Sequence, residues 1–589
     1  MPDLKKAFLL LLLLVLICSL FACGKTEESD ETQNDQAEEE TNVQQEPIMI
    51  CGRPISSYVV LKDDNTDASS ALRSAVKNFS GVNLQRSKTA PEDGRMIRFE
   101  TDSRISPAAC RIYTEGNTLV VAAYRANFLK QAATAFGTLL VGEQVRFDAG
   151  YDQTLTYTPV SYESVKDSTL KLTGDSDKDP MTYTGGETAV IHVAAVSGDQ
   201  IVSVPKFKIV TYVESTQKSD TTYVSGTKGY CSVTLKSKRA GVAYCTVTAC
   251  DADGNALNNF TLVEPGNSSS HYMSSVIFDM GSISVAARPD DYLSFWQGVT
   301  AEVRAMAIEI VSMEEIESLQ DGYKTYYVAL RCGTDDLGRP GVAAGYLSVP
   351  NGTGKIGLQL RFQSYGYDRP DRIYQSGTAT FSVCSHSVEL DKYVKGSDYY
   401  NEMYNSIAGG PGEPGFGQRT NITRDTIYFK QMLMRDLLAV RFMVQYFGES
   451  GNGRWNGVEL SFGGTSMGGF QSMATAALTP YVADVVPSNV NVSIPWMCDL
   501  DGYNVGRKLS SFRPPRESAT LYYDTVYFAA MIVETCRVNI ECHLGDSICP
   551  ASGVTTLYNA VRGPKKITFV SNSTHGGGWD GTSFVLQNE

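Results

Sequence analysis

The chain has 589 residues, of which 42% are hydrophobic, 20% are charged and 10% are aromatic. This length exceeds what one hydrophobic core usually supports, so we expect several domains, and the composition excludes a fibrous or wholly disordered protein. The formal net charge of -14 argues against a nucleic-acid partner.

The first residues carry the pattern of a bacterial export signal. Two lysines precede an apolar run over residues 7–21, which is too short for an ordinary membrane-spanning helix. The run ends in Leu20-Phe21-Ala22-Cys23, which resembles the lipobox of bacterial lipoproteins. We therefore expect residues 1–22 to be a signal peptide and Cys23 to carry the lipid that anchors the protein at the extracellular face of the cell membrane. A plain signal peptide followed by an incidental cysteine is the alternative interpretation.

Residues 23–157 divide into a tether and a first domain. Residues 23–47 are acidic and rich in Gln, Asn and Thr, so they are predicted to be a disordered, solvated tether. Residues 48–157 combine β-prone runs with helical spacing, as in Leu72, Val76 and Phe79, and are predicted to form a small α/β domain. The pattern resembles the domain that precedes the catalytic barrel of β-hexosaminidases, which leaves open a structural spacer or a glycan-binding module.

Residues 160–276 have an all-β pattern. Turn residues separate four β-rich runs at 189–196, 206–213, 229–235 and 242–249. This spacing predicts an immunoglobulin-like β-sandwich. The acidic run 251–255 resembles a hairpin turn of bacterial immunoglobulin-like domains, and a bare turn is favoured over a calcium site. Residues 265–270, followed by His271, are interpreted as a linker.

The cysteines do not form a recognisable framework. Apart from Cys18 in the signal and Cys23, eleven are scattered along the chain without paired CxxC spacing. We interpret them as small core residues. A disulfide from Cys231 to Cys245 or Cys250 is left open.

Residues 277–589 alternate strand and helix patterns. Strands are predicted at 356–362, 458–462, 538–544 and 567–570, and an amphipathic helix near 433–447. This alternation predicts a mostly parallel sheet covered by helices on both faces.

A nucleophile motif follows one of these strands. Gly464-Thr465-Ser466-Met467-Gly468 matches G-x-S-x-G and is followed by a helical pattern over residues 470–478. Such a motif places the serine on a tight strand-to-helix turn with its hydroxyl exposed. The strand before it and the helix after it make Ser466 the predicted nucleophile of an α/β-hydrolase.

Few residues can serve as the base and the acid. Of the five histidines, only His575 follows the last predicted strand, which the chain order Ser…Asp…His of α/β-hydrolases requires. His386 precedes the nucleophile, and His543 is interpreted as a packed side chain. Asp546 follows strand 538–544 and is predicted to be the acid, in preference to Asp499, Asp501 and Asp524.

These motifs resemble the acetyl xylan esterase/cephalosporin C deacetylase family of α/β-hydrolases. The resemblance rests on four segments: 289–296 as an opening helix, Gly345-Tyr346-Leu347-Ser348-Val349-Pro350, the stretch 519–529, and Gly545-Asp546-Ser547-Ile548-Cys549-Pro550-Ala551-Ser552 around the acid. It covers about residues 277–589. It implies a catalytic triad of Ser466, Asp546 and His575, and an oxyanion hole made by the backbone N–H groups of Met467 and Tyr365.

The chain departs from the family at three places. Met467 stands where the family has glutamine, Cys384-Ser385-His386-Ser387-Val388-Glu389 stands where an R-G-Q motif is expected, and Gly576 follows the histidine in place of glutamate. These changes leave the triad in place and put the substrate and the oligomeric state in question.

The sequence therefore predicts a serine carboxylesterase that removes acetyl groups from xylan-type oligosaccharides without a cofactor or a metal. The membrane is expected to be contacted through the lipid at Cys23, and the N-terminal domains are candidates for glycan contact. Two alternatives stay open. One is another serine hydrolase on the same fold, such as a feruloyl esterase or a peptidase. The other is a non-catalytic surface lipoprotein that binds glycans.

Overall fold

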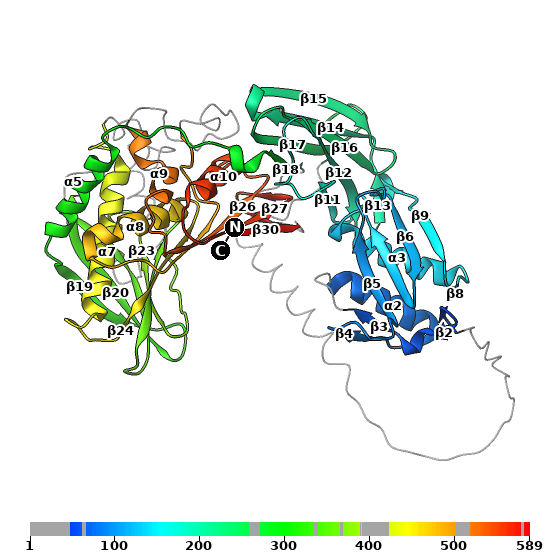
Figure 1. The fold of residues 1–589 in the computed structure, drawn as a ribbon, viewed down its shortest axis with the longest axis horizontal. Helices are drawn as coiled ribbons and strands as arrows, with labels where there is room; N and C mark the ends of the chain where they lie inside the picture. The colour runs from blue at the N-terminus through cyan, green and yellow to red at the C-terminus, as the bar shows by residue number, and fades with distance from the viewer. Residues whose placement is uncertain are drawn as a thin grey trace, which may run out of the picture. The chain divides into compact units, whose positions relative to one another are not determined.

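The computed structural model describes residues 47–61, 66–198, 200–257, 271–334, 340–365, 369–388, 390, 398, 423–500, 519–578 and 582–588 (Figure 1). The predicted signal peptide, Cys23, the tether up to residue 46, Asp501 and the linker 265–270 lie outside these residues. Within the described part, no helix is long and apolar enough to cross a membrane.

Residues 47–156 contain two helices and two sheets. A six-stranded sheet has the order β4-β3-β5-β7-β6-β9, and a small sheet has the order β2-β1-β8. The two helices of this region, α2 (Thr66–Ser80) and α3 (Leu129–Val141), pack against each other. Leu72 and Val76 of α2 are fully buried, as their spacing predicts. The strands are β1 (Met49–Ile50), β2 (Arg53–Pro54), β3 (Val59–Leu61), β4 (Gln85–Ser87), β5 (Met96–Thr101), β6 (Ala109–Glu115), β7 (Thr118–Ala123), β8 (Arg146–Phe147) and β9 (Asp152–Thr156).

Residues 160–278 form two mainly antiparallel sheets with one shared hydrophobic core. One sheet has the order β10-β13-β12-β11 with β16 paired to β12, and the other has the order β15-β14-β17-β18. Its last strand differs from the prediction, because His271 begins β18 and is not part of a linker. The strands are β10 (Val160–Ser161), β11 (Leu170–Ser176), β12 (Thr188–Ser197), β13 (Gln200–Ser203), β14 (Lys206–Val213), β15 (Lys218–Ser225), β16 (Tyr230–Lys236), β17 (Gly241–Cys250) and β18 (His271–Phe278).

The cysteines of this region form no disulfide, and the acidic run forms a turn. All eleven described cysteines are free thiols, so Cys231 pairs with neither Cys245 nor Cys250, and these three side chains are buried. Asp251 Oδ1 accepts the backbone N–H groups of Asp253 and Asn255, each at 2.9 Å. The acidic run is therefore an Asx-type turn that closes on its own first carboxylate.

Residues 310–588 form a ten-stranded mixed sheet with the order β19-β20-β21-β23-β22-β24-β25-β26-β27-β30. Neighbours from β23 to β27 are parallel, and the strands at either end are antiparallel. The strands are β19 (Ile310–Ile316), β20 (Tyr323–Thr334), β21 (Pro340–Pro350), β22 (Ile356–Phe362), β23 (Thr378–Val383), β24 (Trp455–Thr465), β25 (Asn489–Ser493), β26 (Arg537–His543), β27 (Lys565–Val570) and β30 (Ser583–Asn588).

Five helices cover this sheet as a single layer, since they contact one another in succession. They are α5 (Tyr292–Ala305), α7 (Tyr428–Phe447), α8 (Met467–Ala483), α9 (Thr525–Ala529) and α10 (Ala551–Ala560), and Figure 1 shows them grouped together. The expectation of helices on both faces is therefore wrong for the described residues.

The strands themselves give the physical reason for this one-sided layer. Side chains on a strand alternate between faces, and each central strand alternates buried apolar with polar residues. In β24 and β25 the apolar set is Leu460, Phe462, Val490 and Val492, and the polar set includes Ser461, Thr465, Asn491 and Ser493. A sheet buried on both faces would read as a continuous apolar run. We call the side with Thr465, Asn491 and Ser493 the polar face.

Candidate active site

Ser466 lies on a strained turn between β24 and α8. Its backbone has φ 55° and ψ -116°, a left-handed region that non-glycine residues rarely adopt. The turn is held by its own hydrogen bonds, because Ser466 N–H donates to Ser493 O at 3.0 Å and Ser466 O accepts from Trp496 N–H at 3.0 Å. The sequence prediction of a strand, a serine turn and a helix agrees with this geometry.

The glycines around Ser466 are required by close backbone approaches. A Cβ atom on Gly464 would lie 2.4 Å from the carbonyl carbon of Gly468, and one on Gly468 would lie 2.3 Å from Phe362 O. Strand β24 can therefore turn directly into α8 while the end of β22 passes against the first turn of that helix. This arrangement brings the segment after Phe362 beside Ser466, the predicted nucleophile.

Asp546 and His575 form a hydrogen-bonded pair at the carboxyl edge of the same sheet. His575 Nδ1 lies 2.8 Å from Asp546 Oδ2, and Asp546 is fully buried. The other carboxylate oxygen of Asp546 accepts the backbone N–H groups of Ile548 and Cys549 at 2.7 and 2.8 Å. An Nδ1–H that donates to a carboxylate leaves Nε2 with its lone pair available for a proton, which is the tautomer that a general base needs.

Two short strands carry the histidine. Strands β28 (Ser573–Thr574) and β29 (Gly577–Gly578) pair antiparallel, with Thr574 opposite Gly577. His575 and Gly576 are thus the two residues of the hairpin tip. The hairpin is joined to the acid loop because Gly545 N–H donates to Ser573 O at 2.8 Å.

Cys549 lies near all three residues of the predicted triad. One polar atom from each of Asp546, Cys549 and His575 lies within 4.8 Å of the others. The Cys549 thiol also lies near enough to the Ser466 side chain for that side chain to lower its pKa, but burial has the larger effect and raises the pKa well above the ordinary value. The thiol therefore stays protonated, and Asp546 and His575 use their facing atoms on each other, so we assign no metal to this group among the described residues.

The two expected oxyanion donors, Met467 and Tyr365, lie on the first turn of α8 and on the loop after β22. These two segments approach each other closely at Gly468. Met467 is the first residue of α8, where backbone N–H groups have no acceptor within the helix and the helix dipole favours negative charge. Tyr365 lies three residues after β22. Gln471 supports its loop, because Nε2 donates to Gln363 O at 3.0 Å and to Ser385 Oγ at 2.9 Å.

The rejected candidates have structural contacts. His386 is buried and its ring hydrogen bonds with the Tyr428 hydroxyl. Asp524 caps α9, accepting Val526 N–H at 2.9 Å and also the N–H groups of Asp499 and Leu500. Neither side chain is available for general acid–base work.

Sequence reasoning missed the residues that support the site. Ser385 lies in the segment where the R-G-Q motif was expected, and it donates to Gln363 O at 2.9 Å while its own carbonyl accepts from Arg435 at 2.9 Å. Gln471 is four residues into α8, where its spacing gives no signal of a role at the loop. Such contacts between distant segments leave no local pattern in the sequence.

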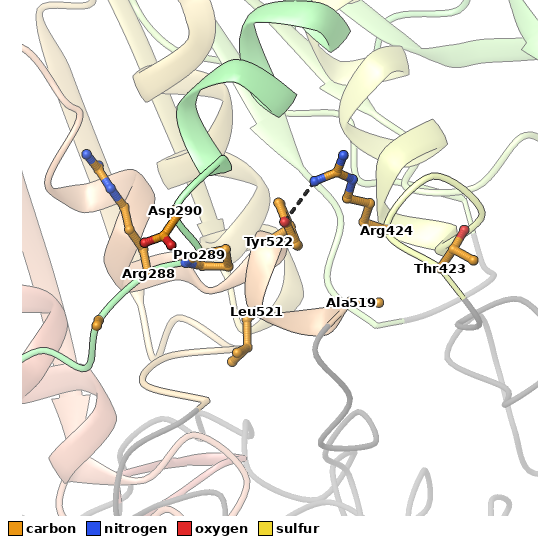
Figure 2. A pocket seen from close by; sticks show the side chains of 9 residues that line it. Arg288, Pro289, Asp290, Thr423, Arg424, Ala519, Leu521 and Tyr522 are labelled. Carbon is orange, nitrogen blue, oxygen red and sulfur yellow. Dashed lines mark hydrogen bonds between the residues drawn. The ribbon is translucent and has the colours of Figure 1, made fainter.

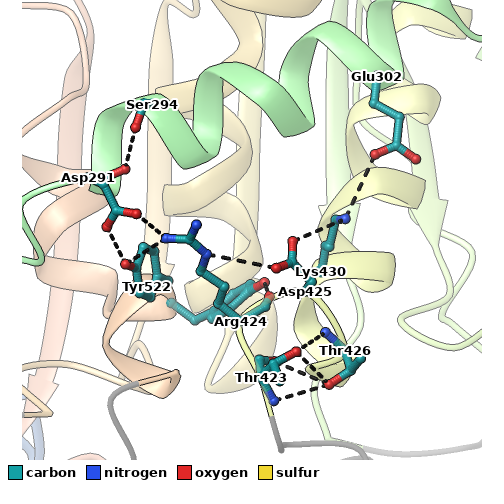
Figure 3. Close-up of polar contacts among 10 residues, drawn as sticks. Asp291, Ser294, Glu302, Thr423, Arg424, Asp425, Thr426, Lys430 and Tyr522 are labelled. Carbon is teal, nitrogen blue, oxygen red and sulfur yellow. Dashed lines mark hydrogen bonds and ion pairs between the residues drawn. The ribbon is translucent and has the colours of Figure 1, made fainter.

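A second polar cluster joins the start of α5 to the segment before α9 (Figure 3). The Arg424 guanidinium pairs with Asp291 and donates to the Tyr522 hydroxyl at 2.8 Å, and that hydroxyl donates to Asp291. Arg424 and Tyr522 border an open cavity of about 650 Å³ (Figure 2). The cavity is lined by Ala287, Arg288, Pro289, Asp290, Thr423, Arg424, Ala519, Leu521 and Tyr522, none of which belongs to the predicted triad.

Comparison with known proteins identifies relatives of residues 282–584. This segment, just over half of the chain, matches the acetyl xylan esterase (AXE1) family. The acetyl esterase Axe7A of Xylanibacter ruminicola is 24% identical over 299 residues, which are 49% of this chain and 63% of that protein. The chain thus spans less than two thirds of the length of this curated relative.

Two solved structures are similar over half of the chain. They are an acetyl xylan esterase from Paenibacillus sp. R4, with 17% identity, and acetyl xylan esterase 1 from Thermoanaerobacterium sp., with 18% identity. Each match covers 50% of this chain and 93% or 92% of the other, with a TM-score of 0.40. By the family match over residues 282–584, the chain belongs to the acetyl xylan esterase family.

Proposed function

We propose that the chain is a serine esterase that hydrolyses acetyl esters on xylan-type oligosaccharides, with Ser466, Asp546 and His575 as its triad. One observation carries the proposal: the strained serine turn and the Asp546–His575 pair converge on the Cys549 thiol. Membership of the acetyl xylan esterase family supports acetyl as the acyl group and xylan-type oligosaccharides as the substrate class.

The reaction that this arrangement supports has two steps. His575 Nε2 takes the proton of the Ser466 hydroxyl as its oxygen attacks the acetyl carbonyl, and the N–H groups of Met467 and Tyr365 hold the oxyanion. The sugar hydroxyl leaves with the proton from His575, which gives an acetyl-enzyme. Water, deprotonated by the same imidazole, then attacks that ester and releases acetate and the free serine.

The direct test combines labelling with turnover. An organophosphonate probe should label Ser466, because only an activated hydroxyl reacts, and the purified protein should release acetate from acetylated xylo-oligosaccharides. Ser466→Ala should abolish both, whereas Ser225→Ala on the distant strand β15 should change neither. Release of ferulate or cleavage of peptides in place of acetate would assign another serine hydrolase. Glycan binding without labelling would assign a non-catalytic role.

We also propose that the protein is held at the extracellular face of the membrane through a lipid on Cys23. The support is the sequence pattern alone, since Cys23 lies outside the described residues. Cys23→Ala should leave a diffusible protein or an unprocessed precursor in cell fractionation. A variant that remains fully processed and fully membrane-bound would remove this part of the proposal.

A further inference from the structure

His543, which sequence reasoning treats as a packed side chain, hydrogen bonds at both ring nitrogens. It is the last residue of β26 and is only 5% exposed. Its Nδ1 lies 2.6 Å from Thr574 O, and its Nε2 lies 3.1 Å from Glu541 Oε1. Thr574 is the residue directly before His575, so this ring contacts the hairpin that carries the predicted base.

The chemistry of the two partners fixes the protonation state of the ring. A backbone carbonyl only accepts hydrogen bonds, and so does an ionised carboxylate. A neutral imidazole has a single N–H and can satisfy one of them, whereas an imidazolium donates to both. The Glu541 carboxylate remains ionised, because hydrogen bonds from His543 and Ser493 lower its pKa despite partial burial.

The surroundings favour the charged ring. Burial opposes the charge, but the hydrogen bonds to Glu541 and Thr574 and the negative charge of Asp546 outweigh it, so the pKa of His543 is raised. Val570, opposite His543 on β27, is apolar. On the polar face, Arg361 and Lys566 line a groove together with Glu541. His575, a further titratable residue, lies on the adjacent hairpin directly after Thr574.

The same contacts extend to the nucleophile. Ser493 Oγ donates to Glu541 Oε1 at 2.8 Å, and Ser493 O accepts the N–H of Ser466 at 3.0 Å. One hydrogen-bonded chain thus runs from the Ser466 turn through Ser493, Glu541 and His543 to Thr574. It ties β25, β26 and the β28–β29 hairpin together at the edge of the sheet where the triad lies.

We propose that His543 is a positioning residue, held as an imidazolium by Glu541, that fixes the His575 hairpin relative to Ser466. The proposal rests on the proposed function, since it concerns the geometry of that reaction. Loss of the His543 proton removes one of the two hydrogen bonds and loosens the hairpin. The charged form of His543 exists below its raised pKa and disappears as pH rises through that value. The hydrogen bonds that hold the hairpin are therefore weakened on the alkaline side.

The test compares pH–rate profiles of the whole protein on a nitrophenyl acetate substrate. The wild type should show a decline of kcat on the alkaline side. His543→Gln should lower kcat on the order of tenfold to a hundredfold with little change in KM, and should remove that decline. Glu541→Gln should move that decline to lower pH, because the ring loses its counter-charge. His192→Gln is the matched control and should leave the profile unchanged. In the wild type, the His192 ring hydrogen bonds with Ser232 in the β-sandwich.

A second measurement does not depend on turnover. Deuterium exchange at the imidazole C2 position, followed by mass spectrometry, should give His543 a higher midpoint than His192, and Glu541→Gln should lower it. An ordinary midpoint for His543, or variants that lose thermal stability while keeping the wild-type shape of the profile, would overturn the inference. If the wild type hydrolyses no acetyl ester at all, the proposed function fails instead, whatever the exchange midpoint.

Discussion

Ser552 Oγ donates a hydrogen bond of 2.6 Å to Glu214 Oε1, which joins the β-sandwich to the helix that follows Asp546, the predicted catalytic acid. Glu214 is fully buried and also accepts Val242 N–H at 3.0 Å. Ser552 lies in the first turn of α10, six residues after Asp546. A carboxylate at a helix N-terminus is stabilised by the helix dipole, so a residue outside the family-matched segment supports the acid loop.

We predict that Glu214→Ala destabilises the protein and lowers esterase activity. Its removal takes the carboxylate acceptor from the Val242 N–H and the Ser552 hydroxyl, of which Ser552 keeps its contact with the Tyr244 hydroxyl at 3.3 Å. A buried group that is left unpaired costs about 1–3 kcal/mol. The measurement is the thermal midpoint together with kcat. Glu163→Ala, an exposed glutamate of the same region, is the control and should alter neither. Equal behaviour of the two variants would show that the sandwich does not support the acid loop.

Ser466→Ala and His575→Ala should each reduce kcat on the order of a thousandfold or more, and the double variant should lose little beyond either one. The reason is that the base has no function without the hydroxyl that it deprotonates. Single-turnover and steady-state rates of all three variants check this. Losses that multiply would mean that the two residues act independently.

Gly468→Ala should nearly abolish activity. The new methyl group would lie 2.3 Å from Phe362 O and would push the Tyr365 loop from the nucleophile. Displacements of about 1 Å at such a site cost on the order of a hundredfold in rate. Gly298→Ala in α5 is the control, because its Cβ meets nothing within 4 Å and alanine favours a helix by up to about 1 kcal/mol. Full activity of Gly468→Ala would contradict the oxyanion-hole assignment.

Asp175→Asn should stabilise the protein at neutral pH. Burial raises the pKa of this carboxyl from 3.8 to about 6, against the opposing effects of Thr582 and Arg125. A raised pKa means that the folded state is fully stable below about pH 4 and loses stability as pH rises toward 6, by at most about 3 kcal/mol. The gain in thermal midpoint should therefore be present at pH 7 and vanish near pH 4. Asp220→Asn on exposed β15 should show no such pH dependence.

Acetate esters should be favoured over butyrate, and octanoate should hardly react. The proposed acetyl specificity requires a narrow acyl site, in which one misfitting methylene costs roughly 1–3 kcal/mol. The cationic segment 507–516, which carries no long apolar stretch in the sequence, lies outside the described residues. The measurement is kcat/KM for the three nitrophenyl esters. A flat or rising profile would exclude an acetyl esterase and leave a serine hydrolase.

The local sequence was sufficient to predict the elements that carry the chemistry. The alternation of β24, the glycines around Ser466 and the apolar run of α8 specify a strand, a tight turn and a helix, because each depends on neighbours within a few residues. Asp546 and His575 followed from their positions after strands, since parallel strands deliver their carboxyl ends to one edge of a sheet. The fold type and the Asp546–His575 contact were therefore within reach of sequence reasoning.

Only the tertiary structure decided what supports those residues. Glu214 and Ser552 hydrogen bond although they are 338 residues apart in the sequence, and Gln471 and Ser385 do so at a separation of 86 residues. Neither pair therefore produces a periodic signal in the sequence. The one-sided helix layer seen among the described residues depends on which segments pack against the sheet, which alternation of strands and helices does not reveal. His543 shows the limit most clearly. A histidine in a strand is usually a packed side chain. Glu541, two residues earlier, lies on the same face of β26, but the second acceptor, the carbonyl of Thr574, becomes visible only when β26 and the hairpin lie side by side.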